Sequence, residues 1–298
     1  MKKILKEMKL SIIIPAYNSE KKIRELIKRI KLVKMGNVKQ EIIVIDDFSK
    51  DKTREIAKRL SAIVYSHPKN YGLAETFKTE MEKCLELKAD IIVHIDADGQ
   101  YLAKEIPLLV GEVQKGYDLV LGSRFKGKIE QMPFIKKLGN RLFSRLISNI
   151  AGIKISDSQT GFRAFTKEVA RIGTTSYYTY TQEQIIRAVR NKFRIKEVPI
   201  YFAKRKDKSR LMKNPFDFAL RAGINILRVY RDYEPLKFFG RIGAFFFLFG
   251  FIIGAWLVYL YITTGAVGRT PSLILSMLLI LTGFQITLFG FLADMVKK

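Results

Sequence analysis

Two aspartates separated by one residue are the side chains best suited to hold a metal ion. Asp96 and Asp98 directly follow the apolar run 91–95 (IIVHI). Residues i and i+2 of an extended segment point the same way, so both carboxylates can face one site. Oxygen ligands that leave coordination positions open suit Mg²⁺ or Mn²⁺ carrying a diphosphate. The pattern therefore predicts a cation that neutralises a nucleoside-diphosphate leaving group; a turn or helix cap is the alternative.

Other titratable residues offer less specific signals. Asp46 and Asp47 end a second apolar run, where they could cap the following helix or accept hydrogen bonds from a base or ribose; both roles are compatible. His67 and His94 lack metal-ligand spacing, and we expect His94 to belong to the core. Neither the full motif G-x-x-x-x-G-K-[ST] nor G-x-G-x-x-G occurs, which argues against kinase or dinucleotide chemistry.

The elements that must position these residues alternate regularly over residues 9–125. Short apolar runs predict strands at 10–14, 41–45, 62–65, 91–95 and 119–122, and helical spacing fills 19–34, 51–59, 73–87 and 102–115. This alternation predicts an α/β fold with a mostly parallel sheet and helices on both faces. Ligands of such sheets bind at the carboxyl ends of the strands, where the acidic pairs fall.

Two long uncharged runs lie near the C-terminus, at 242–262 and 270–293. About 20 apolar residues cross the hydrocarbon core of a bilayer, so we predict a two-helix transmembrane hairpin. Lysine and arginine gather before the first run and after the second, whereas the connecting loop has one charge. By the positive-inside rule, this predicts that both termini and the N-terminal domain are cytoplasmic. Gly250-x-x-x-Gly254 would allow helix pairing and hence a homo-oligomer.

The net charge of +25 requires a partner. For a membrane protein, anionic headgroups are a simpler partner than nucleic acid, and Asp46, Asp47, Asp96 and Asp98 would repel nucleic acid. Segment 131–150 predicts an amphipathic helix with an apolar stripe opposite basic residues that include Arg141 and Arg145. With a second such segment at 215–230, this favours helices at the membrane interface. The only cysteine, Cys84, excludes an intrachain disulfide and suits a reducing cytosol.

Seven short motifs, in this order and spacing, resemble glycosyltransferase family 2. They are PAYN (15–18), DDFSKD (46–51), NYGLA (70–74), DADGQ (96–100), GSR (122–124), DSQTGFRAF (157–165) and Glu183. Within the family, residues 9–212 resemble the polyprenyl-phosphate glycosyltransferases of the dolichyl-phosphate mannose and glucose synthase type. The resemblance implies a GT-A (Rossmann-like) catalytic domain that inverts the anomeric centre. The two-span anchor also matches that subgroup.

The resemblance also implies roles for individual residues. Asp96, Asp98 and Gln100 would hold the metal. Asp98, Asp157 and Arg124 would be catalytic, with Asp157 orienting the acceptor first and acting as a weak base second, although SDSQTG could also be only a cap or turn. Glu183 would meet the acceptor, or simply pair with Arg187 four residues later. The nucleotide-sugar would contact Pro15, Tyr17, Asn18, Glu20, Ile45, Asp47, Gly72, Asp96, Ala97, Gln100, Arg205 and Ser209, and the acceptor Arg124, Arg141, Arg145, Arg163 and Glu183.

Two positions depart from the family's pattern. Ser19 stands where glutamate often follows Tyr-Asn, so Ser19 or Glu20 would replace that contact. The segment 204–210 lacks the glycine of R-x-x-G-x-S, so Lys204 or Arg210 could share the role given to Arg205.

We therefore predict a cytoplasmic GT-A domain (1–212), a basic juxtamembrane helical segment (213–240) and a two-span anchor (241–298). The expected reaction transfers a hexose from a UDP- or GDP-sugar to polyprenyl or dolichyl phosphate, and DSQTGF favours UDP. One rival is a membrane transferase with a sugar acceptor, which would make Asp98 or Asp157 an essential base. A processive synthase is disfavoured because that class has a Q-x-x-R-W motif, and the single tryptophan of this chain, Trp256, lies in a predicted span. Another rival is a non-catalytic membrane adaptor or nucleic-acid binder.

Overall fold

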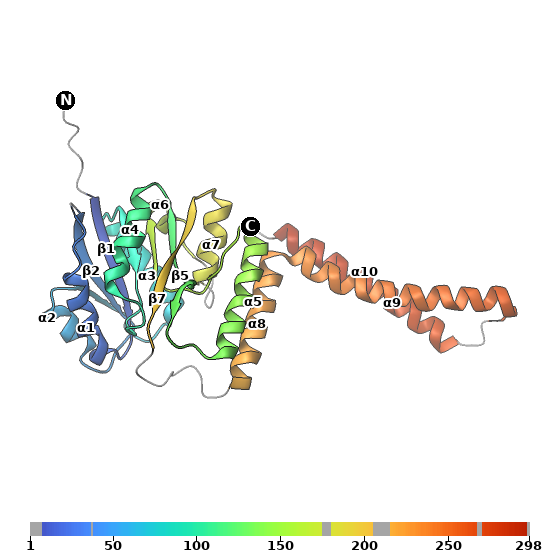
Figure 1. The fold of residues 1–298 in the computed structure, drawn as a ribbon. Coiled ribbons are helices and arrows are strands. Elements are labelled where there is room, and N and C mark those ends of the chain that lie inside the picture. The colour runs from blue at the N-terminus through green and yellow to red at the C-terminus, as the bar shows by residue number, and fades with distance from the viewer. Residues whose placement is uncertain (1–7, 37, 175–179, 205–214, 267–269, 297–298) are drawn as a thin grey trace, which may run out of the picture. The chain divides into compact units, whose positions relative to one another are not determined.

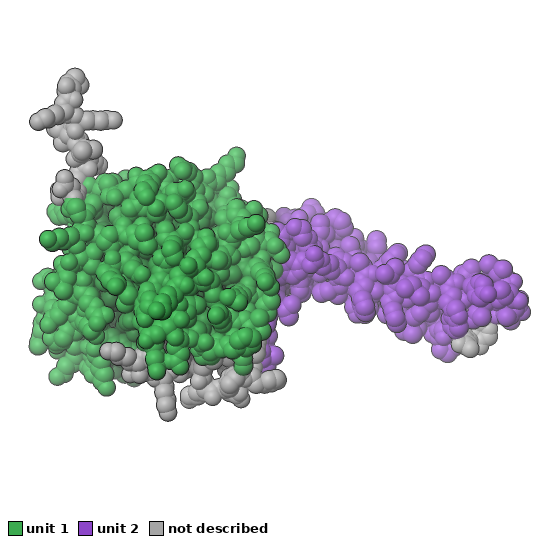
Figure 2. Space-filling model, in the orientation of Figure 1, with its two compact units in different colours: residues 1–219 green, residues 220–298 purple. Residues whose placement is uncertain are grey.

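The computed structural model describes residues 8–36, 38–174, 180–204, 215–266 and 270–296. The chain divides into two compact units, Met1–Ala219 and Leu220–Lys298 (Figure 2). The first contains all the predicted catalytic residues, and the second contains both predicted spans.

The first unit is built on one seven-stranded sheet, in the order β3-β2-β1-β4-β6-β5-β7 (Figure 1). All neighbouring strands are parallel except β6, which runs antiparallel to β4 and β5. This confirms the predicted mostly parallel α/β sheet. The strands are β1 (Met8–Ala16), β2 (Val38–Asp46), β3 (Ile63–Ser66), β4 (Ile91–His94), β5 (Leu119–Ile129), β6 (Arg163–Thr166) and β7 (Ile195–Phe202).

Helices follow the strands, as the alternation predicted. In α1, Ile23, Leu26, Ile27 and Ile30 form a buried stripe at helical spacing, and the central strands are buried along nearly their whole length. The helices of this unit are α1 (Glu20–Lys31), α2 (Thr53–Arg59), α3 (Leu73–Glu86), η1 (Ala103–Glu105), α4 (Ile106–Gln114), α5 (Phe134–Ala151), α6 (Lys167–Arg171) and α7 (Tyr180–Arg190); α8 (Pro215–Tyr233) extends into the second unit.

Strands β6 and β7 were not among the predicted elements. β6 is the second half of the motif DSQTGFRAF, and it lies between β4 and β5. It therefore brings a segment that follows residue 157 directly beside the strand that ends before Asp96. Only the tertiary pairing reveals this neighbourhood.

The second unit contains α9 (Pro235–Thr264) and α10 (Thr270–Val296), which pack against each other. Both are long and apolar enough to cross a membrane. Small residues allow the close approach: a Cβ on Gly250 would lie 2.9 Å from the Ser276 carbonyl oxygen, and the Ser276 hydroxyl donates to the Gly250 carbonyl at 2.8 Å. Gly254 also faces the Ser276 hydroxyl, so the Gly250-x-x-x-Gly254 face is used within the hairpin.

Candidate active site

The predicted nucleotide-binding residues meet at the carboxyl ends of adjacent parallel strands. Pro15 and Ala16 at the end of β1 pair with Ile45 and Asp46 at the end of β2. Tyr17, just beyond β1, is 43% exposed. The side chain of Asn18 accepts a hydrogen bond from the Lys50 backbone at 2.9 Å, so the loops after β1 and β2 are tied together.

Glu20 joins the same two loops, because its carboxylate accepts from the Lys52 backbone at 3.2 Å. Within the part of the chain that the structure describes, the side chain of Ser19, the other candidate for the missing glutamate contact, accepts no such bond; the Ser19 backbone donates to the Thr53 hydroxyl at 2.8 Å. Glu20 therefore both begins α1 and links it to the loop that follows β2.

The Asp47 carboxylate organises the loop before α3. It accepts hydrogen bonds from the backbone amides of Tyr71 and Gly72, each at 2.8 Å, and lies 2.8 Å from His67 Nδ1. Gly72 has φ +86°, a conformation that favours glycine. The motifs DDFSKD and NYGLA are thus one structural element, and Asp47 is buried within it.

Asp96 and Asp98 follow β4 and are both partly exposed. The Asp96 carboxylate packs against Gly161: a Cβ there would lie 2.9 Å from Asp96 Cγ. Asp98 accepts from the Gln100 backbone at 3.0 Å and lines a cavity of about 430 Å³. The Gln100 side chain is buried and donates to the Ala203 carbonyl at 3.1 Å, which fixes its amide.

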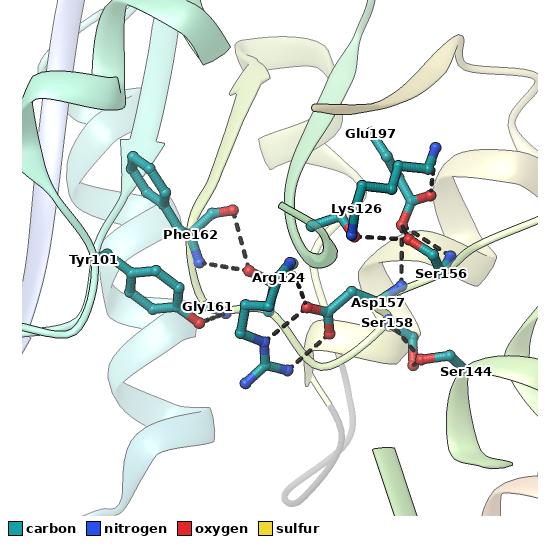
Figure 3. Close-up of polar contacts among 12 residues, drawn as sticks. Tyr101, Arg124, Lys126, Ser144, Ser156, Asp157, Ser158, Gly161, Phe162 and Glu197 are labelled. Carbon is teal, nitrogen blue, oxygen red and sulfur yellow. Dashed lines mark hydrogen bonds and ion pairs between the residues drawn. The ribbon is translucent and has the colours of Figure 1, made fainter. Parts of the chain in front are cut away.

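A buried ion pair joins the motifs GSR and DSQTGF. Arg124 Nε and Nη2 each donate to the Asp157 carboxylate at 2.7 Å, and the Arg124 backbone donates at 2.9 Å. Figure 3 shows the Arg124 side chain between Tyr101 and Asp157. Burial acts to lower the pKa of Arg124, but the Tyr101 and Asp157 oxygens more than offset it, so that pKa is raised.

The loop that carries Asp157 is held from both sides. Glu197 accepts from the backbone amides of Ser156 and Asp157 at 2.9 and 3.0 Å, and it also pairs with Lys126 at 2.9 Å (Figure 3). Ser144 of α5 accepts from the Ser158 backbone at 3.0 Å. Asp157 is therefore a fixed partner of Arg124, completely buried.

Arg163 and Glu183, both predicted to meet the acceptor, lie in the interior. Arg163 is completely buried, and its guanidinium donates to the Thr181 carbonyl at 3.1 Å and the Gln184 side chain at 2.8 Å. Glu183 is 1% exposed and pairs with Arg187 at 2.7 Å, the helical salt bridge that we weighed as its alternative. Through these contacts, both residues help to hold α7 in position.

His94 lies in the core, as expected, but it makes polar contacts beneath Asp96. Its Nδ1 lies 2.6 Å from the Gly161 carbonyl oxygen, and its Nε2 lies 3.3 Å from Glu80, with both side chains fully buried. Burial lowers the pKa of His94 to about 3, although the bond to Gly161 acts to raise it. Burial, together with the charge of Asp96, raises the pKa of Glu80 well above its usual value.

The outer face of α5 is apolar and exposed. Phe134 is 77% exposed, and Ile135, Leu138 and Leu142 are also exposed, each to nearly half. Arg141 and Arg145 are also exposed on this helix, and the Arg141 guanidinium lies 5.4 Å from the ring of Phe125, next to Arg124 in the chain. Helix α5 therefore connects the ion pair to an amphipathic surface.

Two predicted residues, Arg205 and Ser209, lie outside the described residues. The structure in turn brings in residues that the sequence did not single out. Tyr101 receives a hydrogen bond from the Gly161 amide at 3.1 Å, and Glu197 and Ser144 support Asp157. Gly161 and Tyr101 lie in or directly after quoted motifs, which was the available signal. Glu197 and Ser144 had none.

Comparison with known proteins agrees with this geometry. The sequence model of "Glycosyl transferase family 2" matches residues 11–173. A UDP-N-acetylglucosamine–dolichyl-phosphate N-acetylglucosaminyltransferase of Methanococcus voltae is 33% identical over 63% of this chain and 83% of its own. A dolichyl-phosphate hexose transferase of Haloferax volcanii is 29% identical over 74% of this chain and 93% of its own.

Among solved structures, a glucosyl-3-phosphoglycerate synthase of Mycobacterium tuberculosis, in complex with Mn²⁺, UDP and glucosyl-3-phosphoglycerate, has a TM-score of 0.57. It is 20% identical over 74% of this chain and 80% of its own, so the likeness is one of fold. The family match covers more than half of the chain and includes Asp47, Asp96, Arg124 and Asp157. The chain belongs to glycosyltransferase family 2.

Proposed function

We propose that this glycosyltransferase moves a hexose from a nucleotide-sugar to a polyprenyl or dolichyl phosphate, with inversion at the anomeric carbon. The products are the lipid-phosphate-linked sugar and a nucleoside diphosphate. The names of the relatives support a lipid-phosphate acceptor. The donor named for the Methanococcus relative favours UDP over GDP, in agreement with the preference drawn from DSQTGF.

The observation that carries the proposal is the position of α5 beside the Arg124–Asp157 pair. Through Ser144 this helix contacts the Asp157 loop, and through Arg141 it lies over Phe125. Its exposed apolar row, led by Phe134, suits the boundary between headgroups and acyl chains. We infer that Arg141 and Arg145 dock the lipid phosphate while the apolar row meets the bilayer.

The chemistry of a phosphate acceptor fits the state of Asp157. Its carboxylate already accepts three hydrogen bonds from Arg124, so it is poorly placed to take a proton. A phosphate monoester is an anion at neutral pH and needs no such base. Among the described residues, Arg124 uses Nε and Nη2 for Asp157, and no hydrogen bond is made by Nη1, which could donate to a phosphate oxygen. In this proposal Asp157 orients Arg124, and Arg124 binds phosphate.

The donor set also fits a divalent cation. Asp96 and Asp98 supply hard oxygen ligands; Gly161 leaves room for the Asp96 carboxylate that a Cβ would fill, and Asp98 lines a cavity. The amide oxygen of Gln100 would complete the set of ligands that the protein supplies to the cation. When bound, Mg²⁺ or Mn²⁺ would supply positive charge opposite the departing diphosphate. Asp96, Asp98 and Gln100 would bind and orient, and Arg124 would add a second, fixed positive charge.

The second unit would anchor the enzyme. Residues Arg228, Arg231, Lys237 and Arg241 precede or begin α9, and Lys297 and Lys298 follow α10. By the positive-inside rule, this charge supports a cytoplasmic catalytic unit and cytoplasmic termini. The same residues and α5 would be attracted to anionic lipids, at about 1 kcal/mol per well-placed cation.

An assay of the full chain in detergent with radiolabelled donors tests the proposal. UDP- and GDP-hexoses, first screened by thermal shift with Mn²⁺, are incubated with and without polyprenyl phosphate. We expect label in the lipid phase only when both polyprenyl phosphate and a divalent cation are present. Transfer to a sugar acceptor with no transfer to polyprenyl phosphate would reject the lipid acceptor and favour the sugar-acceptor rival.

A further inference from the structure

A polar cluster lies beneath Asp96, in a part of the core that the proposed reaction does not use. It joins His94 at the end of β4, Glu80 of α3 and the Gly161 peptide just before β6. His94 and Glu80 are completely buried, and the rings of Phe77 and Tyr180 lie near the imidazole. Buried polar side chains are costly unless they make compensating contacts, so this cluster calls for a physical role.

Gly161 connects the cluster to Asp96. A Cβ at this position would lie 2.9 Å from Asp96 Cγ, closer than real Cβ atoms approach, and 3.0 Å from Asp96 Oδ1. The backbone of Gly161 does not have a positive φ, so its conformation does not by itself require glycine. A side chain at this position would have to push the Asp96 carboxylate away, so glycine lets that carboxylate lie directly against its Cα. The Gly161 peptide is thus one of the surfaces that set the position of the carboxylate.

Hydrogen bonds hold the Gly161 peptide on both sides. Its amide donates to the Tyr101 hydroxyl at 3.1 Å, and its carbonyl faces His94 Nδ1 at 2.6 Å. A carbonyl oxygen can only accept, so the proton must be on Nδ1. Nε2 then lies 3.3 Å from a Glu80 carboxyl oxygen without a hydrogen bond to it, so the bond from Nδ1 to the Gly161 carbonyl is what orients the ring.

We propose that His94 is a positioning residue that fixes the Gly161 peptide against the Asp96 carboxylate and so holds this carboxylate ready for a divalent cation. The inference rests on the proposed function, because it takes Asp96 as a metal ligand. In metalloproteins generally, residues that contact a metal ligand without touching the metal orient that ligand, and their mutation changes metal affinity by about 10- to 100-fold.

Two polar substitutions separate this role from simple packing. In His94→Asn, the side-chain amide nitrogen stands near the position of Nδ1 and can still donate to the Gly161 carbonyl. In His94→Gln, the amide reaches the position of Nε2 and leaves that carbonyl without its donor. Glutamine fills more of the imidazole volume, so a packing role would favour Gln over Asn, and the positioning role predicts the reverse.

The measurement is Mn²⁺ binding by electron paramagnetic resonance, with the full chain in detergent and saturating UDP, or GDP if UDP does not bind. Nucleotide binding without metal and thermal unfolding are followed alongside. We expect His94→Gln to weaken Mn²⁺ binding by about 10- to 100-fold, and His94→Asn to remain within about threefold of wild type. If His94→Gln does not fold, His94→Phe replaces it as the variant without a donor.

Three outcomes are informative. Wild-type affinity in the donorless variant, or equal losses in the Asn and Gln variants, would overturn the positioning role while leaving the proposed function intact. Absence of Mn²⁺ binding by the wild-type protein would instead overturn the metal assignment of Asp96 and Asp98, and with it this inference. The expected order, wild type and Asn above Gln, would support it.

Discussion

Asp157→Asn separates a structural counter-ion from a catalytic base. The substitution keeps the size of the side chain but removes its charge, and it leaves the guanidinium of Arg124 buried at 4% exposure. Breaking a buried ion pair by removing one partner costs about 3–5 kcal/mol. In a domain of this size 1 kcal/mol lowers Tm by about 2–4 °C, so we expect the first unit, Met1–Ala219, to melt about 6–20 °C lower.

Circular dichroism of the full chain in detergent would follow this transition, with Glu25→Gln as the control. Glu25 pairs with Arg29 on the surface of α1, where loss of one charge costs about 1 kcal/mol or less. The double variant Arg124→Met/Asp157→Leu should lose less stability than Asp157→Asn, because no buried charge is left unpaired. An Asp157→Asn protein that has the Tm of the wild type yet no transferase activity would refute this reasoning. Asp157 would then again be the candidate for a catalytic base.

Three further predictions address metal, acceptor and pH. Asp98→Asn should abolish radiolabel transfer but leave Tm unchanged, because Asp98 is partly exposed and an amide oxygen can still accept from the Gln100 backbone. Arg141→Glu/Arg145→Glu should raise KM for polyprenyl phosphate by about 30-fold or more, from about 1 kcal/mol for each cation lost, with donor Kd unchanged. The raised pKa of Glu80 means that the folded chain keeps a proton that the unfolded chain loses above pH 4.5. The contribution of Glu80 to stability therefore falls as pH rises from there, by at most about 1.4 kcal/mol per pH unit, and Glu80→Gln should lack this contribution in urea unfolding at pH 5 to 7.

Each of these has a contrary result. Undiminished transfer by Asp98→Asn would remove the metal assignment. Arg24→Glu/Lys28→Glu on the exposed face of α1 makes the same charge change away from α5; an equal rise in KM there would reduce the docking role to a general attraction to anionic lipid. Parallel pH profiles for wild type and Glu80→Gln would mean that Glu80 does not keep its proton in the fold.

Local chemistry made much of the fold and the site predictable. Buried parallel strands are continuous apolar runs, and their ends are marked by polar residues, so the runs before Asp46 and Asp96 located one edge of the sheet. The two long apolar helices could be predicted because a bilayer demands length and apolarity along a continuous segment, and α9 and α10 are long and apolar enough to cross one. Family motifs then led to the prediction that Arg124 and Asp157 are site residues, although not that they pair with each other.

By itself, then, the sequence determined most of the elements, the neighbouring pair Asp96 and Asp98, and the two long apolar helices, since each depends on residues close together in the chain. Only the tertiary structure decided which distant residues share a surface. The antiparallel insertion of β6 brings Gly161 beside Asp96, and the Arg124–Asp157 bond joins residues 33 positions apart. It also placed Arg163 and Glu183 in the interior. Burial and pairing of this kind are set by the order of strands in the sheet, which no local pattern of residues encodes.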